Sequence, residues 1–332
     1  MELKGKALYN LLRMSATDRP ELEIQEWQVE DLRPLSTKNL FRRLSSLKLP
    51  LDEKSFSLYA QEVETPEDLL ECVWIEENNP EQRDQAYLLL FELWRRLLSD
   101  KRSISLFCDE LDHLIDSYDK DSLEEEEQLD QALSFLEDIL DDACDMQGLA
   151  PSEAFDEISK YCAHDLEVFI YDYCLEQLEN KDAIFASELL DAFYEYVSDK
   201  KWFDFLRARL FYSTESEEGN KLIERLLDQL KEEPDVDLLM QIIQSLVHYG
   251  DLHLFPLAIS QTFPELQTEK EYQELLSHVA DYYRFLDREA EEGKVRALLK
   301  QRAKRALDNP IDEAAREQWD SLIKEFTSIK PE

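Results

Sequence analysis

Apolar residues recur at intervals of three and four along most of the chain, which is the spacing of one face of an α-helix. The clearest runs are Leu129, Leu133, Leu136, Leu140 and Ala143, then Leu222, Leu226 and Leu230, then Leu238, Ile242 and Leu246. No stretch shows the sustained two-residue alternation of a half-buried strand. The pattern predicts an all-α protein of about twelve to fifteen helices.

Capping residues mark the expected helix starts. Thr65-Pro66 and Asn79-Pro80 each place a capping side chain before a proline at the first helical position. Ser122 followed by Glu125 has the spacing of a capping box and predicts a helix running to about Met146. Asn309-Pro310 predicts the start of the last helix.

Glycines mark the expected helix ends. The chain has only 5 glycines, which favours helices joined by short loops over a β-rich fold with many turns. Gly148 should end the helix that Ser122 opens, and Gly250 and Gly293 predict two further helix ends.

The later part of the chain contains a possible repeat. A shift of 50 residues lays one apolar set over another: Phe193, Val197 and Phe205 over Ile243, Val247 and Phe255. This spacing is typical of a HEAT/TPR-like helical-repeat solenoid, although the hairpins of an irregular helical bundle would align in the same way. We therefore expect a multi-helix array of one of these two kinds.

Charge divides the chain into three expected parts. Residues 1–50 form an N-terminal arm and the first helices, and the least regular stretch is 15–34, with Pro20 and Pro34. Residues 51–180 form an acidic helical lobe, and residues 181–332 form a helical-repeat-like C-terminal lobe. Residues 51–200 hold 42 acidic and 10 basic side chains, which accounts for most of the net charge of −39.

So negative a field opposes direct binding to nucleic acid or to anionic lipid, because phosphate affinity comes from positive charge. No run approaches the roughly 18 apolar residues of a membrane helix, and Asn10 and Arg13 interrupt any signal-peptide core. Five scattered cysteines without a C-x-x-C pair are typical of reduced, buried thiols. These features predict a cytoplasmic protein whose partner is another protein with a basic or amphipathic segment.

The sharpest acidic feature is a stripe of four aspartates at helical spacing, formed by Asp138, Asp141, Asp142 and Asp145. Carboxylates can bind hard cations such as calcium or magnesium. The opposite side of the same predicted helix carries the apolar run, so a solvated face that serves as a docking surface is the favoured interpretation.

Two histidine positions invite a catalytic hypothesis. Glu110-x-x-His113 has the spacing of half a di-iron site, and His164-Asp165 is the pair that helical metal phosphohydrolases of the HD type carry. Neither has the further ligands that its site requires, and a histidine beside a helix-capping aspartate explains the second pair more simply. Nucleophile and phosphate-loop motifs are missing as well, so we expect no catalytic residue, no metal and no cofactor.

Two other segments are candidates for partner binding. Residues 294–307 contain no acid and predict an amphipathic basic helix, which can be a solvated face, an internal brace against the acidic region or an external docking site. Its candidate contact residues are Lys294, Arg296, Lys300, Lys304 and Arg305. The aromatic pair Trp202-Phe203 belongs to a set of rings that are mostly core, a few of which can line a partner's groove.

The function expected from the sequence is a protein-binding adapter, chaperone or regulatory scaffold with a strongly acidic surface. Two alternatives stay open: a helical metal-dependent hydrolase or oxygenase near His113 and His164-Asp165, and an acidic nucleic-acid mimic that inhibits a DNA-binding protein.

Overall fold

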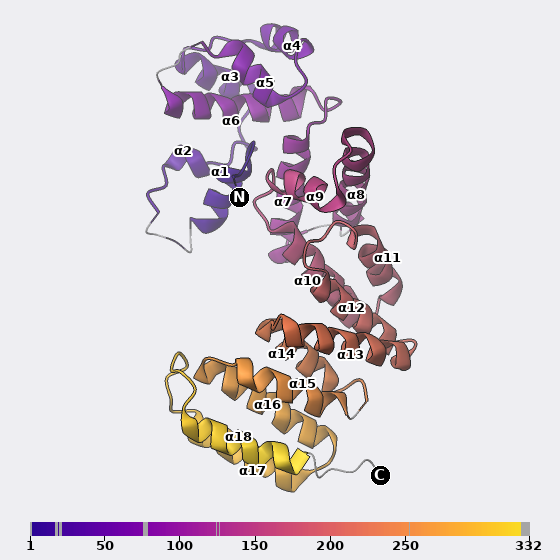
Figure 1. Ribbon diagram of the computed structural model, residues 1–332. Helices are drawn as coiled ribbons and strands as arrows, with labels where there is room; N and C mark the ends of the chain where they lie inside the picture. The colour runs from indigo at the N-terminus through magenta and orange to yellow at the C-terminus, as the bar shows by residue number, and fades with distance from the viewer. Residues whose placement is uncertain are drawn as a thin grey trace. The chain divides into compact units, whose positions relative to one another are not determined.

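The computed structural model describes residues 2–16, 19, 22–75, 79–123, 125, 127–251 and 253–326. This part of the chain contains eighteen α-helices and one short 3₁₀ helix (η1, Phe263–Glu265), and no β-strand (Figure 1). The predicted all-α, multi-helix class is therefore confirmed, with more helices than expected. The chain divides into two compact units: unit 1 is residues 1–169 with 195–197, and unit 2 is residues 170–194 with 198–332.

Unit 1 is built from nine helices and the first turn of a tenth. They are α1 (Ala7–Ser15), α2 (Glu26–Val29), α3 (Thr37–Ser46), α4 (Glu53–Gln61), α5 (Pro66–Val73), α6 (Pro80–Leu97), α7 (Ile104–Asp119), α8 (Glu127–Gln147), α9 (Pro151–Ser159) and the start of α10 (Leu166–Glu179).

Helix α6 lies at the centre of the N-terminal core of unit 1. Nine consecutive residues from Ala86 to Trp94 are buried, so neighbours surround this helix on every side. Glu92 falls inside this run and is buried with them. Burial alone would raise the pKa of Glu92, but hydrogen bonds from Arg95 and Arg96 outweigh it, and the pKa lies below its usual value.

Arginines tie the described residues near 32–35 to the rest of unit 1. Arg96 donates hydrogen bonds to the carbonyl oxygens of Leu32, Arg33 and Leu35. The guanidinium of Arg33 in turn reaches Asp109 on α7, at 3.2 Å. This part of the expected N-terminal arm is therefore pinned to α6 and α7.

Unit 2 also consists of helices. Its helices are the remainder of α10, then α11 (Ala183–Phe193), α12 (Lys200–Tyr212), α13 (Ser216–Glu232), α14 (Val236–Leu246), α15 (Leu254–Thr262), α16 (Glu269–Phe285), α17 (Glu289–Arg302) and α18 (Glu313–Phe326). The most extensive packing joins helices adjacent in sequence, α12 on α13 and α16 on α17, while α18 packs on α15. All six residues of the proposed repeat are buried.

Several predicted boundaries are confirmed. The side chains of Thr65 and Asn79 accept the backbone N–H groups that cap α5 and α6. Gly148 has a φ of +68°, the left-handed conformation that ends a helix, and α8 ends one residue before it.

Three predicted boundaries are wrong. Gly293 lies inside α17, which already begins at Glu289 with three acids in its first turn, where the helix dipole favours them. Helix α18 begins at Glu313, because the Asp312 side chain caps it by accepting the N–H of Ala315. Ser122 donates to the carbonyl of Ser117 instead of opening α8, which begins at Glu127, and one residue of that expected capping box, Glu124, lies outside the described residues.

Candidate functional site

Helices α7 and α8 form an antiparallel hairpin in unit 1. Ser103 caps the start of α7 by accepting the N–H of Leu106, and Gly148 closes α8. The rings of Phe107 and Phe135 meet edge to face, with centroids 5.2 Å apart, and join the two helices. The predicted apolar run of α8 is buried as expected: Leu129, Leu133, Leu136, Leu140 and Ala143.

A second stripe of α8 borders two surface hollows. It recurs every three or four residues and lies to one flank of the buried face. Its members are Gln128, Gln131, Ala132, Phe135, Ile139, Asp142 and Met146. Phe135 borders one hollow and Ile139, one turn further along, borders the other, so the two hollows follow one another along this flank. We call them together the α8 groove.

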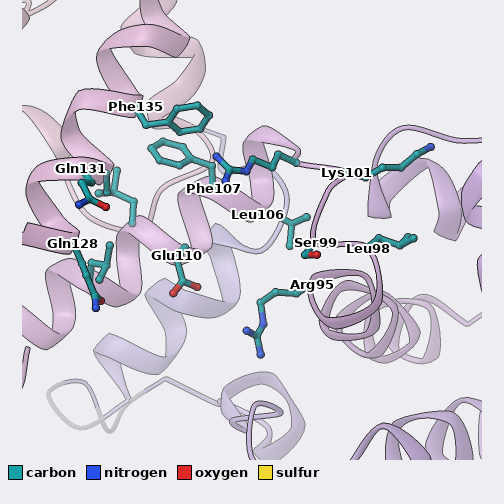
Figure 2. A pocket seen from close by; sticks show the side chains of 14 residues that line it. Arg95, Leu98, Ser99, Lys101, Leu106, Phe107, Glu110, Gln128, Gln131 and Phe135 are labelled. Carbon is teal, nitrogen blue, oxygen red and sulfur yellow. The ribbon is translucent and has the colours of Figure 1, made fainter. Parts of the chain in front are cut away.

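The first hollow, near the start of α8, has a volume of about 440 Å³. The residues after α6 and the outer side of α7 form its other wall (Figure 2). Apolar side chains form most of this wall and floor: Leu98, Leu106, Phe107, Leu111, Leu114 and Phe135. Arg95, Lys101 and Arg102 bring positive charge to its rim, and Arg102 lies over the ring of Phe135, 5.3 Å from the centroid.

The second hollow, near the end of α8, has a volume of about 340 Å³ and is closed by α9. Two of its apolar residues face solvent: Met146 is 84% exposed and Ile104 is 38% exposed. Lys4 lies at its edge and pairs with Glu157 at 2.9 Å. Exposed apolar side chains beside a hollow are what a partner's apolar face requires.

The predicted aspartate stripe lies beside this groove. Asp138, Asp141, Asp142 and Asp145 are all exposed, and Asp142 itself borders the second hollow. Asp141 differs from the others because it accepts a hydrogen bond from the hydroxyl of the buried Tyr196. The carboxylates repel one another: burial, together with the charges of Asp141 and Asp138, raises the pKa of the neighbouring Glu137.

Two buried carboxylates of α7 hold α1 and the segment before α10 in place. Asp109 and Asp112 are each 2% exposed, and the amide of Asn10 donates to both at 3.0 Å. Burial would raise the pKa of Asp109, but Lys6 at 2.8 Å and Arg33 at 3.2 Å hold the pKa below its usual value. This network fixes the position of α7, which forms one wall of the groove.

The structure pairs His164 with Asp112 and not, as the catalytic hypothesis would require, with its sequence neighbour Asp165. The ring nitrogen Nδ1 of His164 lies 3.1 Å from Asp112, whose carboxylate also accepts the backbone N–H groups of Ala163 and His164. Asp165 instead caps α10 by accepting the N–H of Val168. Burial and the nearby Arg33 lower the pKa of His113. Among the described residues, no group of three or more histidine, cysteine, aspartate or glutamate side chains is arranged to hold a metal ion.

The basic segment of unit 2 is partly an internal brace. Arg302 is 1% exposed and forms a two-pronged ion pair with the buried Glu269, while Arg305 pairs with Asp312. The helix ends at Arg302, so Lys304 and Arg305 lie beyond it, contrary to the predicted helix over 294–307. Arg296 pairs with Glu292 and Asp281, and Lys294, Lys300 and Lys304 are exposed.

The aromatic pair gives no docking surface as a whole. Phe203 is 1% exposed and packs in the core of unit 2, so its assignment as a contact residue is wrong. Trp202 is half-buried, lies edge to face against Tyr171 and donates its indole N–H to Asp235 at 3.1 Å.

The groove residues that sequence reasoning missed carry a readable signal. Helix α8 has more apolar residues than its buried face needs, and the surplus of Phe135, Ile139 and Met146 falls on one flank at helical spacing. The facing wall could not be read in the same way, because residues 95–107 meet α8 only through the tertiary fold.

Comparisons with known proteins add no relative: no protein-family model matches the chain, and neither a curated protein nor a solved structure is significantly similar to it. Within the described residues, no helix is long and apolar enough to cross a membrane.

Proposed function

We propose that this protein is an adapter that binds an amphipathic helical segment of a partner protein in the α8 groove. The observation that supports this proposal is the surplus apolar stripe of α8, which borders two successive hollows and is left open to solvent at Met146. A helix laid into such a groove contributes apolar residues at spacings of three and four, which is a recurrent mode of peptide recognition.

The dimensions suit a helix of ordinary length. From Gln128 to Met146 the stripe covers 18 residue steps, which at 1.5 Å per residue is about 27 Å. A partner segment of about 18 residues therefore matches the groove from end to end.

The charge of the surroundings favours a segment that is basic on its polar face. Residues 51–200 carry 42 acidic side chains against 10 basic ones, and three exposed aspartates of the stripe, Asp138, Asp142 and Asp145, lie on α8 itself. Opposite charges across an interface accelerate encounter and exclude wrong partners.

The proposal is tested with a synthetic 18-residue amphipathic helix that has leucines on one face and lysines on the other. Its binding is measured by fluorescence anisotropy. Met146→Glu should weaken binding at least tenfold, because losing the burial of one methionine costs about 1.5–3 kcal/mol. Leu58→Glu, at an exposed leucine of α4 outside the groove, is the matched control and should bind as wild type does.

The contribution of charge is tested separately by reversing Asp138, Asp142 and Asp145 to lysine. Asp141 is left unchanged because it is hydrogen-bonded to Tyr196. The triple variant should keep its circular dichroism and associate more slowly at low salt, with the difference vanishing at high salt. Equal affinity of wild type and Met146→Glu would overturn the proposal.

A further inference from the structure

The two ends of the α8 groove carry opposite charge. Arg95, Lys101 and Arg102 line the first hollow, although residues 51–200 hold only 10 basic side chains in all. At the other end, Asp142 lines the second hollow and Asp145 follows one turn of α8 later. The charge along the groove therefore changes sign from the start of α8 to its end.

The three cations of the first hollow are not equally available to a partner. The guanidinium of Arg95 is held by the buried Glu92, at 2.7 and 2.9 Å. The ammonium of Lys101 donates to the carbonyl oxygens of Ala60 and Val63, at 3.1 and 2.7 Å.

Arg102 is the cation placed to meet an anion from outside. Its side chain is exposed and lies over the ring of Phe135, inside the hollow. The one acid of this lining, Glu110, is already paired with Arg33 at 3.2 Å.

The acidic end is not neutralised in the same way. Lys4, the cation of the second hollow, pairs with Glu157 of α9. The carboxylates on α8 raise the pKa of their neighbours: burial together with the charges of Asp141 and Asp145 raises the pKa of the Cys144 thiol. This end therefore keeps a negative potential that a partner's cations can meet.

The dipole of α8 acts in the same sense as these side chains, whereas the antiparallel α7, whose first residue Ile104 lines the second hollow, has its dipole reversed, so the charge order rests mainly on the side chains. The C-terminal end of α8, which is partially negative, lies at the acidic hollow, and its N-terminal end lies at the cationic hollow. A bound helix is therefore best placed with its own positive N-terminal end near Asp142 and its negative C-terminal end near Arg102. Such a helix runs antiparallel to α8.

We infer that the groove selects one orientation and one charge order: an amphipathic helix with basic residues in its N-terminal half and acidic residues in its C-terminal half, bound antiparallel to α8. This inference rests on the proposed function, since it specifies the partner of the same groove.

The test compares two 18-residue peptides of equal composition and equal apolar pattern. One has lysines in the first half and glutamates in the second, and the other has the two halves of charge exchanged. Both carry a hydrocarbon staple so that they are equally helical before binding. The first peptide should bind at least tenfold more tightly at low salt, and the difference should shrink as the Debye length falls to about 3 Å at 1 M salt.

Orientation is read directly with a nitroxide at either end of the first peptide. A nitroxide at the N-terminus should broaden the methyl resonance of Met146, while one at the C-terminus should leave it sharp. The matched control exchanges the charges of the groove itself. The double variant Arg102→Glu with Asp142→Lys should reverse the preference between the two peptides.

The outcomes separate the inference from the function on which it rests. If both peptides bind equally well, or if the nitroxide at the C-terminus broadens Met146, the inference is overturned and the groove remains a binding site. If neither peptide binds, the proposed function fails and the inference fails with it.

Discussion

Replacing Arg302 by methionine removes the cation from a buried ion pair in unit 2. Nε and Nη2 of Arg302 donate to the two carboxylate oxygens of Glu269, at 2.8 and 2.5 Å, and both side chains are 1% exposed. The same guanidinium reaches Asp312 at 3.2 Å and lies 4.8 Å from the centroid of the Tyr272 ring. These contacts hold α17, the start of α16 and the segment before α18 together.

The expected loss follows from the charge that is left behind. Methionine fills much of the space, but the buried Glu269 carboxylate then loses both hydrogen bonds from the guanidinium and is left with the more distant Arg305, at 3.9 Å, as its cation. Breaking a buried pair in this way costs about 3–5 kcal/mol. For a unit of about 160 residues, such a loss lowers the melting temperature by roughly 6–20 °C.

The assay is thermal and urea unfolding followed by far-ultraviolet circular dichroism. A second variant, Glu269→Gln with Arg302→Met, removes both charges and should recover more than half of the loss, because no uncompensated charge remains buried. Arg305→Met is the control: Arg305 is 37% exposed, so its pairing with Asp312 and its longer contact with Glu269, at 3.9 Å, should together contribute at most about 1 kcal/mol. If Arg302→Met melts within 2 °C of wild type, or if the double variant is less stable than the single one, the reasoning is refuted.

Three further predictions concern backbone, thiols and ionisation. Gly148→Ala should destabilise the protein by about 1 kcal/mol because φ is +68° there, whereas Gly293→Ala, inside α17 with open space around it, should stabilise it by about 0.5–1 kcal/mol; urea unfolding measures both. At pH 8 the exposed Cys72 should react promptly with a thiol reagent, while the buried Cys174, whose pKa burial raises to about 12, should stay unmodified until the protein unfolds. Hydrogen bonding to its arginine partner lowers the pKa of Asp312 to about 2, so the stability that its charge contributes should be present above about pH 4 and lost as the pH falls toward 2; carboxyl NMR shifts that titrate near pH 4 would contradict this.

The sequence predicted the helices well because the interactions that start a helix and orient its faces join residues close together in the chain. A capping side chain such as Thr65 bonds to the backbone only three residues away, and apolar spacing records which face of a helix is buried. The same rules erred where two local signals competed. Gly293 costs a helix only about 1 kcal/mol, which the rest of α17 offsets, and Asp312 caps α18 in place of Asn309.

The groove was only half visible in the sequence. The aspartates of α8 and its surplus apolar residues are encoded by helical spacing alone, whereas the wall from Leu98 to Phe107 depends on how α6 and α7 pack. The burial of Phe203 and Arg302 could not be predicted from the sequence either. The residues around Arg302 do not distinguish a buried arginine from a solvated one, because its partner Glu269 lies 33 positions away.

The chain contains only 4 methionines, and this makes one measurement particularly direct. Met146 is 84% exposed on the α8 groove, while Met240 is 7% exposed in unit 2 and is the internal reference. In protein labelled with ¹³C at the methionine methyl groups, titration with the basic amphipathic peptide should shift the Met146 resonance saturably and leave that of Met240 in place. Binding of the peptide with the Met146 resonance unmoved, or no binding at all, would contradict the assignment of the α8 groove as the partner site.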